Sequence, residues 1–153
     1  MEKIAVPVRR RLPEERRAIT HEFEVGGQNG YITVGLFDDG MPGEIFLTIS
    51  KEGSTISAMM DILAISVSIH LQNGIPLENL VKKFTSIRFE PSGITRNKCI
   101  PSATSIIDYI FRWLGLKFLP LETLESLGIT NCKDCGRVLF EGRYACVSHL
   151  NNK

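Results

Sequence analysis

Long hydrophobic runs and a leader segment are both missing from the sequence. No stretch of about 18 consecutive apolar residues occurs, which is the length a helix needs to cross a bilayer. The segment Met1–Arg11 has no apolar core before its charges, so it does not have the form of a signal peptide. We therefore expect a cytoplasmic protein without a membrane span. In that reducing compartment, cysteines are free, catalytic or metal-bound more often than disulfide-linked.

An excess of one charge is missing too, because 18 lysines and arginines face 17 aspartates and glutamates. A net charge of +1 makes no large field, so nucleic acid and acidic lipid are not favoured as partners. The charge is uneven, however, and residues 1–20 hold six basic side chains against three acidic ones. For this basic N-terminal arm, residues 1–19, two interpretations stay open: a solvated, partly disordered tail, or a segment that contacts phosphate groups.

Catalytic constellations are scarce in the sequence. No Ser/His/Asp arrangement stands out, and no pair of carboxylates stands at a spacing typical of acid–base catalysis. The 153 residues, 43% of them hydrophobic, suffice for one domain with a buried core and a small appendage. We therefore expect a binding or regulatory module rather than a self-sufficient enzyme.

The pattern after the arm predicts an antiparallel meander of three strands. Alternating residues over 20–25 indicate the first strand, Tyr31–Phe37 the second and Glu44–Ser50 the third. Glycine-rich turns at 26–30 and 38–43 join them. A short further strand is expected at Ile87–Phe89.

Helical patterns follow the meander. A helix over 54–72 is apolar on nearly every side, which is typical of a helix buried in a core or in a subunit contact. A second helix is expected at Glu78–Thr85, and a third from Ser102 to Gly115. Because one small sheet would leave apolar surface of the first helix uncovered, we expect a homo-oligomer.

These elements predict an α+β fold, in which the antiparallel meander packs with about three helices and a small zinc-ribbon-like segment ends the chain. The expected organisation is a basic arm at 1–19, an α+β domain at 20–119, a connector at 120–130 and a Cys/His tail at 131–153.

The tail carries two paired half-sites for a metal. Cys132 and Cys135 form a Cys-x-x-Cys pair followed by Gly136, and Cys146 with His149 forms a Cys-x-x-His pair after ten further residues. Zinc prefers four such ligands in a tetrahedron, and a segment this short needs metal to fold. We expect a structural zinc ion here, with a redox-active dithiol at Cys132 and Cys135 as the alternative.

A turn before the first helix offers a second candidate site. Lys51, Gly53, Ser54 and Thr55 combine a cation, a flexible backbone and two hydroxyl groups at a helix N-terminus. Free backbone N–H groups at such a position favour anions. An anion-binding turn is one interpretation, and an ordinary helix cap is the other, because the pattern of a P-loop is absent.

Several runs of the sequence resemble the C-terminal region of adenosylcobalamin-dependent (class II) ribonucleotide reductases, known as the TSCPD domain. The resemblance covers about residues 9–118 and is strongest in runs at 10–13, 19–21, 30–35, 42–44, 51–55, 84–93 and 105–115. In the name-giving motif, Thr104, Ser105 and Asp108 fit, whereas Ile106 and Ile107 replace its Cys and Pro. The tail is similar too, with His149 in place of a cysteine.

The resemblance implies descent from part of a reductase rather than reductase activity, because residues for a catalytic barrel and a cobalamin site are not recognised. Cobalamin is therefore not expected to bind this chain alone. We expect a stand-alone accessory or regulatory module that binds a reductase, a nucleotide or another small anion. The alternatives are a redox accessory that re-reduces a reductase through Cys132 and Cys135, and a nucleic-acid-binding zinc-ribbon protein.

Overall fold

The computed structural model describes residues 5–50, 55–131 and 138–140. The chain divides into two compact units. The first unit contains residues 1–24 and 28–80, and the second contains residues 25–27 and 81–153.

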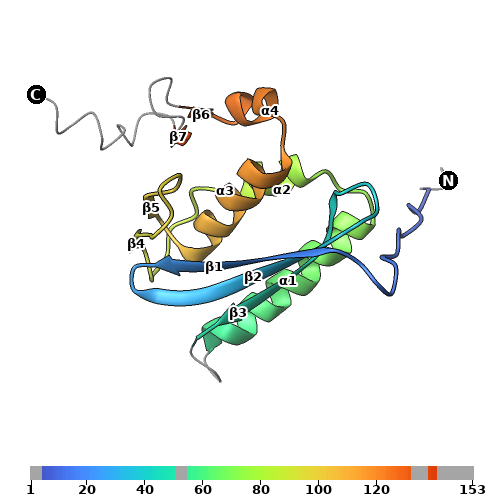
Figure 1. Cartoon of the computed structure of the whole chain (residues 1–153), viewed down its shortest axis with the longest axis horizontal. Coiled ribbons are helices and arrows are strands. Elements are labelled where there is room, and N and C mark those ends of the chain that lie inside the picture. Colours follow the sequence, from blue (N-terminus) through green and yellow to red (C-terminus); the bar gives the residue numbers. More distant parts are fainter. Residues whose placement is uncertain (1–4, 51–54, 132–137, 141–153) are drawn as a thin grey trace, which may run out of the picture. The chain divides into compact units, whose positions relative to one another are not determined.

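The first unit contains the predicted meander, a three-stranded antiparallel sheet in the order β1-β2-β3 (Figure 1). The strands are β1 (Ala18–Val25), β2 (Gln28–Leu36) and β3 (Pro42–Ile49), with Val34 of β2 opposite Ile45 of β3. The first turn is shorter than predicted, because two glycines with positive φ make the whole connection and β2 begins at Gln28.

One face of this sheet is buried and the other is open, as the alternation along each strand requires. Ile32, Ile45 and Leu47 are buried, whereas the neighbouring Tyr31 and Phe46 are exposed. Helix α1 (Thr55–Gln72) packs against β3 and buries Met60, Ala64, Val67 and Leu71. These four residues recur every three or four positions, so they form a single stripe along the helix.

Two side chains of α1 also tie the helix to the edge of β3. The Ser68 Oγ accepts a hydrogen bond from the Ile45 N–H (2.9 Å), and the Gln72 Nε2 donates to the Gly43 carbonyl oxygen (3.0 Å). These bonds satisfy backbone groups that would otherwise be open to pairing with another strand. The helix therefore protects one end of an edge strand.

Helix α1 is long and apolar enough to cross a membrane, judged by length and composition alone. The sequence-based expectation of no membrane span rested on the lack of an unbroken apolar run. The criterion of helix length and mean composition also admits polar residues, and α1 meets it. The finding is weak evidence for a span, because the core helix of a soluble protein passes the same test.

Helix α2 (Leu77–Phe84) links the two units, close to its predicted position. The second unit contains the short pair β4 (Gly93–Ile94) and β5 (Ser102–Ala103), then α3 (Ile106–Phe118) and α4 (Leu121–Ser126). A last antiparallel pair joins β6 (Ile129–Asn131) to β7 (Val138–Phe140).

The fold class is confirmed as α+β, and three details of the second unit differ from the sequence-based expectation. Ile87–Phe89 is not a strand. The third helix is capped by Ser105 rather than Ser102 and runs on to Phe118, and the segment expected to be a connector contains α4. Ser102 instead belongs to β5, because its backbone pairs with Ile94 of β4.

Candidate functional site

The predicted anion-binding turn lies almost entirely outside the described residues. Of its four residues, the structure describes Thr55, which is the first residue of α1 and is exposed. Lys51, Gly53 and Ser54 lie outside the described part of the chain. Anion binding at this turn therefore stays a prediction.

The four predicted zinc ligands, Cys132, Cys135, Cys146 and His149, also lie outside the described residues. The described residues contain no group of three or more metal-ligating side chains. The structure does describe the flanks of the first half-site, because Asn131 at the end of β6 pairs with Val138 at the start of β7. The Cys-x-x-Cys pair thus falls in the connection between two paired strands.

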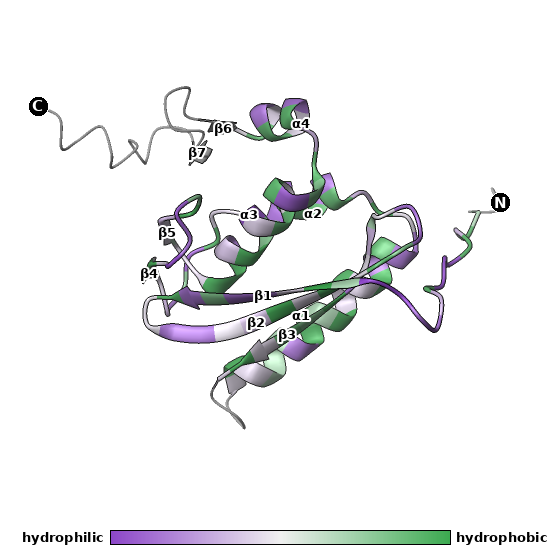
Figure 2. Cartoon of the chain, viewed as in Figure 1, coloured by the Kyte–Doolittle hydropathy of each residue, from purple (hydrophilic) through white to green (hydrophobic). Residues whose placement is uncertain are grey.

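Helix α1 also carries exposed apolar side chains outside its buried stripe. Met59 and Ile62 are 58% and 63% exposed, although residues of this kind are usually buried. We call Ile56, Met59 and Ile62 the outer face of α1. Figure 2 shows green, apolar residues along much of the helix. Complete burial of this helix in the core of the chain is therefore wrong, and its burial in a subunit contact stays a prediction.

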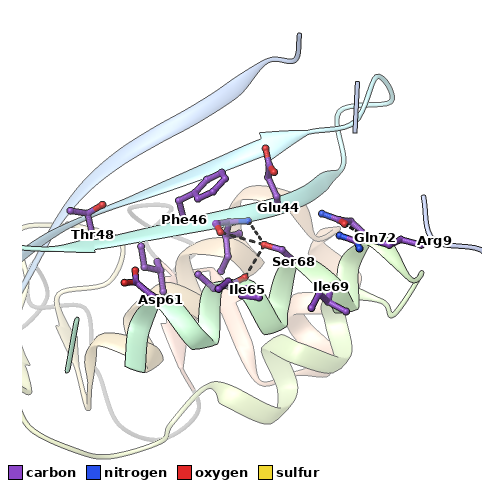
Figure 3. Close-up of a pocket in the computed structure, with 12 residues that line it drawn as sticks. Arg9, Glu44, Phe46, Thr48, Asp61, Ile65, Ser68, Ile69 and Gln72 are labelled. Carbon is purple, nitrogen blue, oxygen red and sulfur yellow. Dashed lines mark hydrogen bonds between the residues drawn. The ribbon is translucent and has the colours of Figure 1, made fainter. Parts of the chain in front are cut away.

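A groove of about 640 Å³ lies between α1 and the edge of β3. Figure 3 shows Ile65 and Ile69 projecting from α1, whereas Phe46 projects from β3 on the side away from the helix. Phe46 is 54% exposed and belongs to the open face of the sheet, as do Glu44 and Thr48, which stand two positions before and after it. Asp61 lies toward one end of the groove, and Arg9 and Gln72 lie toward the other (Figure 3).

The basic N-terminal arm is docked on the first unit over its arginine-rich part. The Arg10 N–H donates to the Gln72 carbonyl oxygen (2.7 Å), and the Arg9 Nε donates to the Gln72 Oε1 (2.8 Å). The Arg16 Nε donates to Glu44 of β3. Hydrogen bonds to β3 and α1 thus hold the stretch from Arg9 to Arg16 against the first unit, and contact of the arm with phosphate groups stays a prediction.

Arg10 contributes two further contacts that hold the arm. Its guanidinium lies 3.8 Å from the centre of the Phe37 ring and forms an ion pair with Asp39 (2.9 Å). The Met41 N–H bonded to Asp39, and then Arg10, lower the pKa of the Asp39 carboxyl below its usual value. Asp39 therefore stays ionised, and the pair stays intact, to a lower pH than usual.

A basic cleft of about 230 Å³ opens beside the arm. Its lining consists of Arg9, Arg11, Leu12, Arg16, Glu44 and Gln72. Three of these residues, Arg9, Glu44 and Gln72, also line the groove of α1 and β3, so the cleft and the groove adjoin. In the sequence these arginines are recognisable only as a cluster of charge, because the fold is what brings the arm to Glu44 and Gln72.

The name-giving motif of the resemblance surrounds a buried ion pair in the second unit. The side chains of Asp108 and Arg112 are 0% and 4% exposed, one helical turn apart on α3. Two parallel contacts join them, from the Arg112 Nε to Oδ1 (2.9 Å) and from Nη2 to Oδ2 (2.7 Å). Asp108 also accepts the N–H of Ser86 (2.6 Å) and of Thr104 (3.0 Å).

The hydroxyl groups of the motif complete this network. The Ser105 Oγ accepts the Asp108 N–H (3.0 Å), which caps α3, and donates to the Ile87 carbonyl oxygen (2.7 Å). The Thr104 Oγ1 donates to the same carbonyl (3.0 Å). Every polar group of Asp108 is thus engaged, so the network fastens the loop after α2 to α3 and leaves no free acid or base.

Ile106 and Ile107 are buried in the first turn of α3, with 0% and 6% of their surface exposed. At these two positions the motif has Cys and Pro, and here apolar side chains fill the core instead. The role of Arg112 was not predicted from the sequence. The available signal was an aspartate and an arginine four positions apart within an otherwise apolar helix.

Taken together, these features define a small α+β domain with a structural motif at its third helix, an exposed apolar helix face and a basic cleft. The family model of the TSCPD domain matches residues 5–118. The chain therefore belongs to the TSCPD domain family.

Known relatives are much longer proteins. The chain is 51% identical over 138 residues to a vitamin B12-dependent ribonucleotide reductase of Streptantibioticus cattleyicolor. The aligned segment covers 90% of this chain and 23% of that protein. It is 52% identical over 120 residues to such a reductase of Rhodopirellula baltica, covering 78% and 12%. A reductase of Bradyrhizobium diazoefficiens is 37% identical over 153 residues, covering 98% and 12%. The chain thus spans less than a quarter of these relatives. No solved structure matches it significantly.

Proposed function

We propose that this chain is a non-catalytic accessory module that binds the catalytic part of a vitamin B12-dependent ribonucleotide reductase in the cytoplasm. The contact surface is the outer face of α1, formed by Ile56, Met59 and Ile62. The exposure of this face carries the proposal, because a soluble protein rarely leaves several large apolar side chains of one helix uncovered without a partner.

The comparisons support the choice of partner. The matching segment makes up less than a quarter of each of these reductases, so in those proteins it accompanies a much larger body. Among residues 55–72, Asp61 is the one acidic side chain and no lysine or arginine occurs, so few charges would have to be desolvated on contact. A large apolar partner surface suits such a helix.

Ile62→Glu is expected to weaken this association about tenfold to a hundredfold, because it places a charge in the centre of an apolar contact. The partner for the measurement is the S. cattleyicolor reductase from which the segment matching this chain has been deleted, and the readout is the dissociation constant. Ile94→Glu is the matched control, since Ile94 is 80% exposed on β4, far from α1 in the sequence.

Light scattering separates the proposed partner from a second copy of the chain. A monomer that binds the truncated reductase supports the proposal. A stable homodimer that Ile62→Glu dissociates, with no binding to the reductase, would instead assign the outer face to self-association, as the expected homo-oligomer would require.

We also propose that Cys132, Cys135, Cys146 and His149 bind one structural zinc ion. The ligand types and spacing support it, as does the position of the first pair between the paired strands β6 and β7.

Native mass spectrometry with metal analysis should find one zinc per chain, and Cys132→Ser should lower that zinc content. Cys99→Ser is the control, because Cys99 is exposed and stands 33 positions before Cys132 in the sequence. A metal-free chain with reactive Cys132 and Cys135 would contradict zinc and favour the dithiol alternative.

A further inference from the structure

The edge of β3 that faces away from β2 is closed at one end and open at the other. At the closed end, the Ile45 N–H bonds to the Ser68 Oγ of α1, so the backbone groups of Ile45 point to this outer edge (Figure 3). Because backbone groups alternate along a strand, those of Leu47 and Ile49 point to the same edge. Among the described residues, no hydrogen-bond partner is found for them. Such unpaired groups are a template for another strand.

The groove between α1 and β3 runs along this open stretch. Leu47 and Thr48 line it on the strand side, and Ile65 and Ile69 line it on the helix side. An occupant therefore meets unpaired backbone groups on one wall and apolar side chains on the other. This combination favours an extended segment over a helix. A helix bonds its own backbone groups internally and would leave those of β3 covered without partners.

Charges at the two ends of the groove give it a direction. Asp61 lies toward the Thr48 end, and Arg9 lies toward the Glu44 end (Figure 3). Among the described residues, Asp61 has no hydrogen-bond or ion-pair partner, and Arg9 engages only its Nε. A strand antiparallel to β3 would begin beside Asp61 and end beside Arg9. A basic residue at its start and an acidic residue at its end would complement these charges.

A second copy of β3 suits this edge less well than a strand from another protein. The open residues, Leu47 and Ile49, would pair with each other across a twofold axis, which would then pass through Thr48. Asp61 lines the groove at the Thr48 end, so the Asp61 carboxylates of both copies would lie near that axis. Like charges in such positions repel each other.

We propose that β3 accepts an extended segment of a partner protein as an additional antiparallel strand at Leu47 and Ile49. The segment alternates apolar and polar residues, with a basic residue beside Asp61 and an acidic residue beside Arg9. The three residues of the outer face of α1 do not line this groove. Strand addition therefore stands or falls independently of reductase association through that face.

Fluorescence anisotropy of the full chain with a labelled hexapeptide tests the proposal. The peptide has blocked ends and consists of lysine, two valine–threonine pairs and glutamate, because a strand of about six residues spans the groove. Ile65→Glu should weaken binding at least about tenfold, since it places a charge on the apolar wall. Ile62→Glu is the matched control and should leave the affinity unchanged. The two isoleucines are 62% and 63% exposed on the same helix, but only Ile65 lines the groove.

A second hexapeptide, with its lysine and glutamate exchanged, tests the direction of the strand. It should bind the wild-type chain about tenfold more weakly than the first peptide, because both end charges are then repelled. Asp61→Lys should weaken binding of the first peptide about threefold and reduce the difference between the two, as expected for an exposed ion pair. Equal affinity of the two peptides for the wild-type chain would overturn the assigned direction.

Amide hydrogen exchange, measured by NMR, tests the backbone pairing itself. Saturation with the first peptide should slow exchange of the Leu47 and Ile49 N–H groups, whereas that of Phe46, which points toward β2, should change little. Binding without this protection would overturn strand addition. Protection that appears in the chain alone and rises with protein concentration would assign the edge to a second copy instead. A dissociation constant above about 1 mM for both peptides would overturn the site. Circular dichroism of each variant verifies that the chain remains folded.

Discussion

Asp108→Ala is expected to lower the free energy of unfolding by about 3–5 kcal/mol, because it leaves the Arg112 guanidinium buried without its counter-charge. The same change removes the acceptor for the Ser86 and Thr104 N–H groups. The chain's single tryptophan, Trp113, lies on α3, so its fluorescence during urea unfolding reports on this unit. The loss should appear as a lower midpoint with little change in slope.

The matched control for this substitution is Asp39→Ala. Asp39 also pairs with an arginine, but its side chain is 50% exposed, so water replaces the lost partner. Its removal should leave the midpoint of urea unfolding nearly unchanged. If both variants lost equal stability, burial would not explain the role of Asp108. If Asp108→Ala were nearly neutral, the motif would not act as a structural fastener.

The meander and the long helix were predictable because their patterns are local. Buried and exposed residues alternate along β2 and β3, and glycines stand in the turns beside these strands. Such signals depend on neighbouring residues alone, so they locate strands and turns to within a few residues. The third helix was harder to delimit, because Ser102 and Ser105 are both suitable caps. Ser105 is the cap because Asp108 lies three residues later and its N–H reaches the Ser105 Oγ.

The surfaces with the greatest functional interest depend on contacts that are distant in sequence. Gln72 meets Arg9 across 63 residues, and Arg16 meets Glu44 across 28. No local pattern in residues 1–19 indicates that these pairs form, so the arm could be described from the sequence as charge alone. Exposure of the outer face of α1, in contrast, was implied by a helix with more apolar surface than a small sheet covers.

The structure also explains how the name-giving motif can lose its Cys and Pro. The residues that keep polar side chains, Thr104, Ser105 and Asp108, are those that make hydrogen bonds. Ile106 and Ile107 contribute apolar volume to the core of the second unit. The polar residues of the motif form the hydrogen-bond network around Asp108, and the other two positions only fill the core. Isoleucine in place of Cys and Pro therefore leaves the hydrogen-bond network intact.

Phe111→Ala is expected to lower the free energy of unfolding by about 3–5 kcal/mol, since Phe111 is fully buried on α3. Its ring lies 4.8 Å from that of Phe84, between ring centres. One turn later Gly115 approaches Val81, where an added Cβ would lie 3.3 Å from Val81 Cγ1. Because α3 is already this close to the end of α2, it has little room to move and fill the cavity. Urea unfolding followed by Trp113 fluorescence gives the measurement.

Two comparisons show whether the lost stability comes from the cavity. Phe111→Leu keeps most of the buried volume and should lose about 1–1.5 kcal/mol, well below the alanine variant. Phe46→Ala deletes the same atoms from a side chain that is 54% exposed, and it should change the stability by less than about 1 kcal/mol. Equal losses for Phe111→Leu and Phe111→Ala would point to the ring contact with Phe84 rather than to volume. In that case, the packing of α3 against the end of α2 would depend on aromatic geometry.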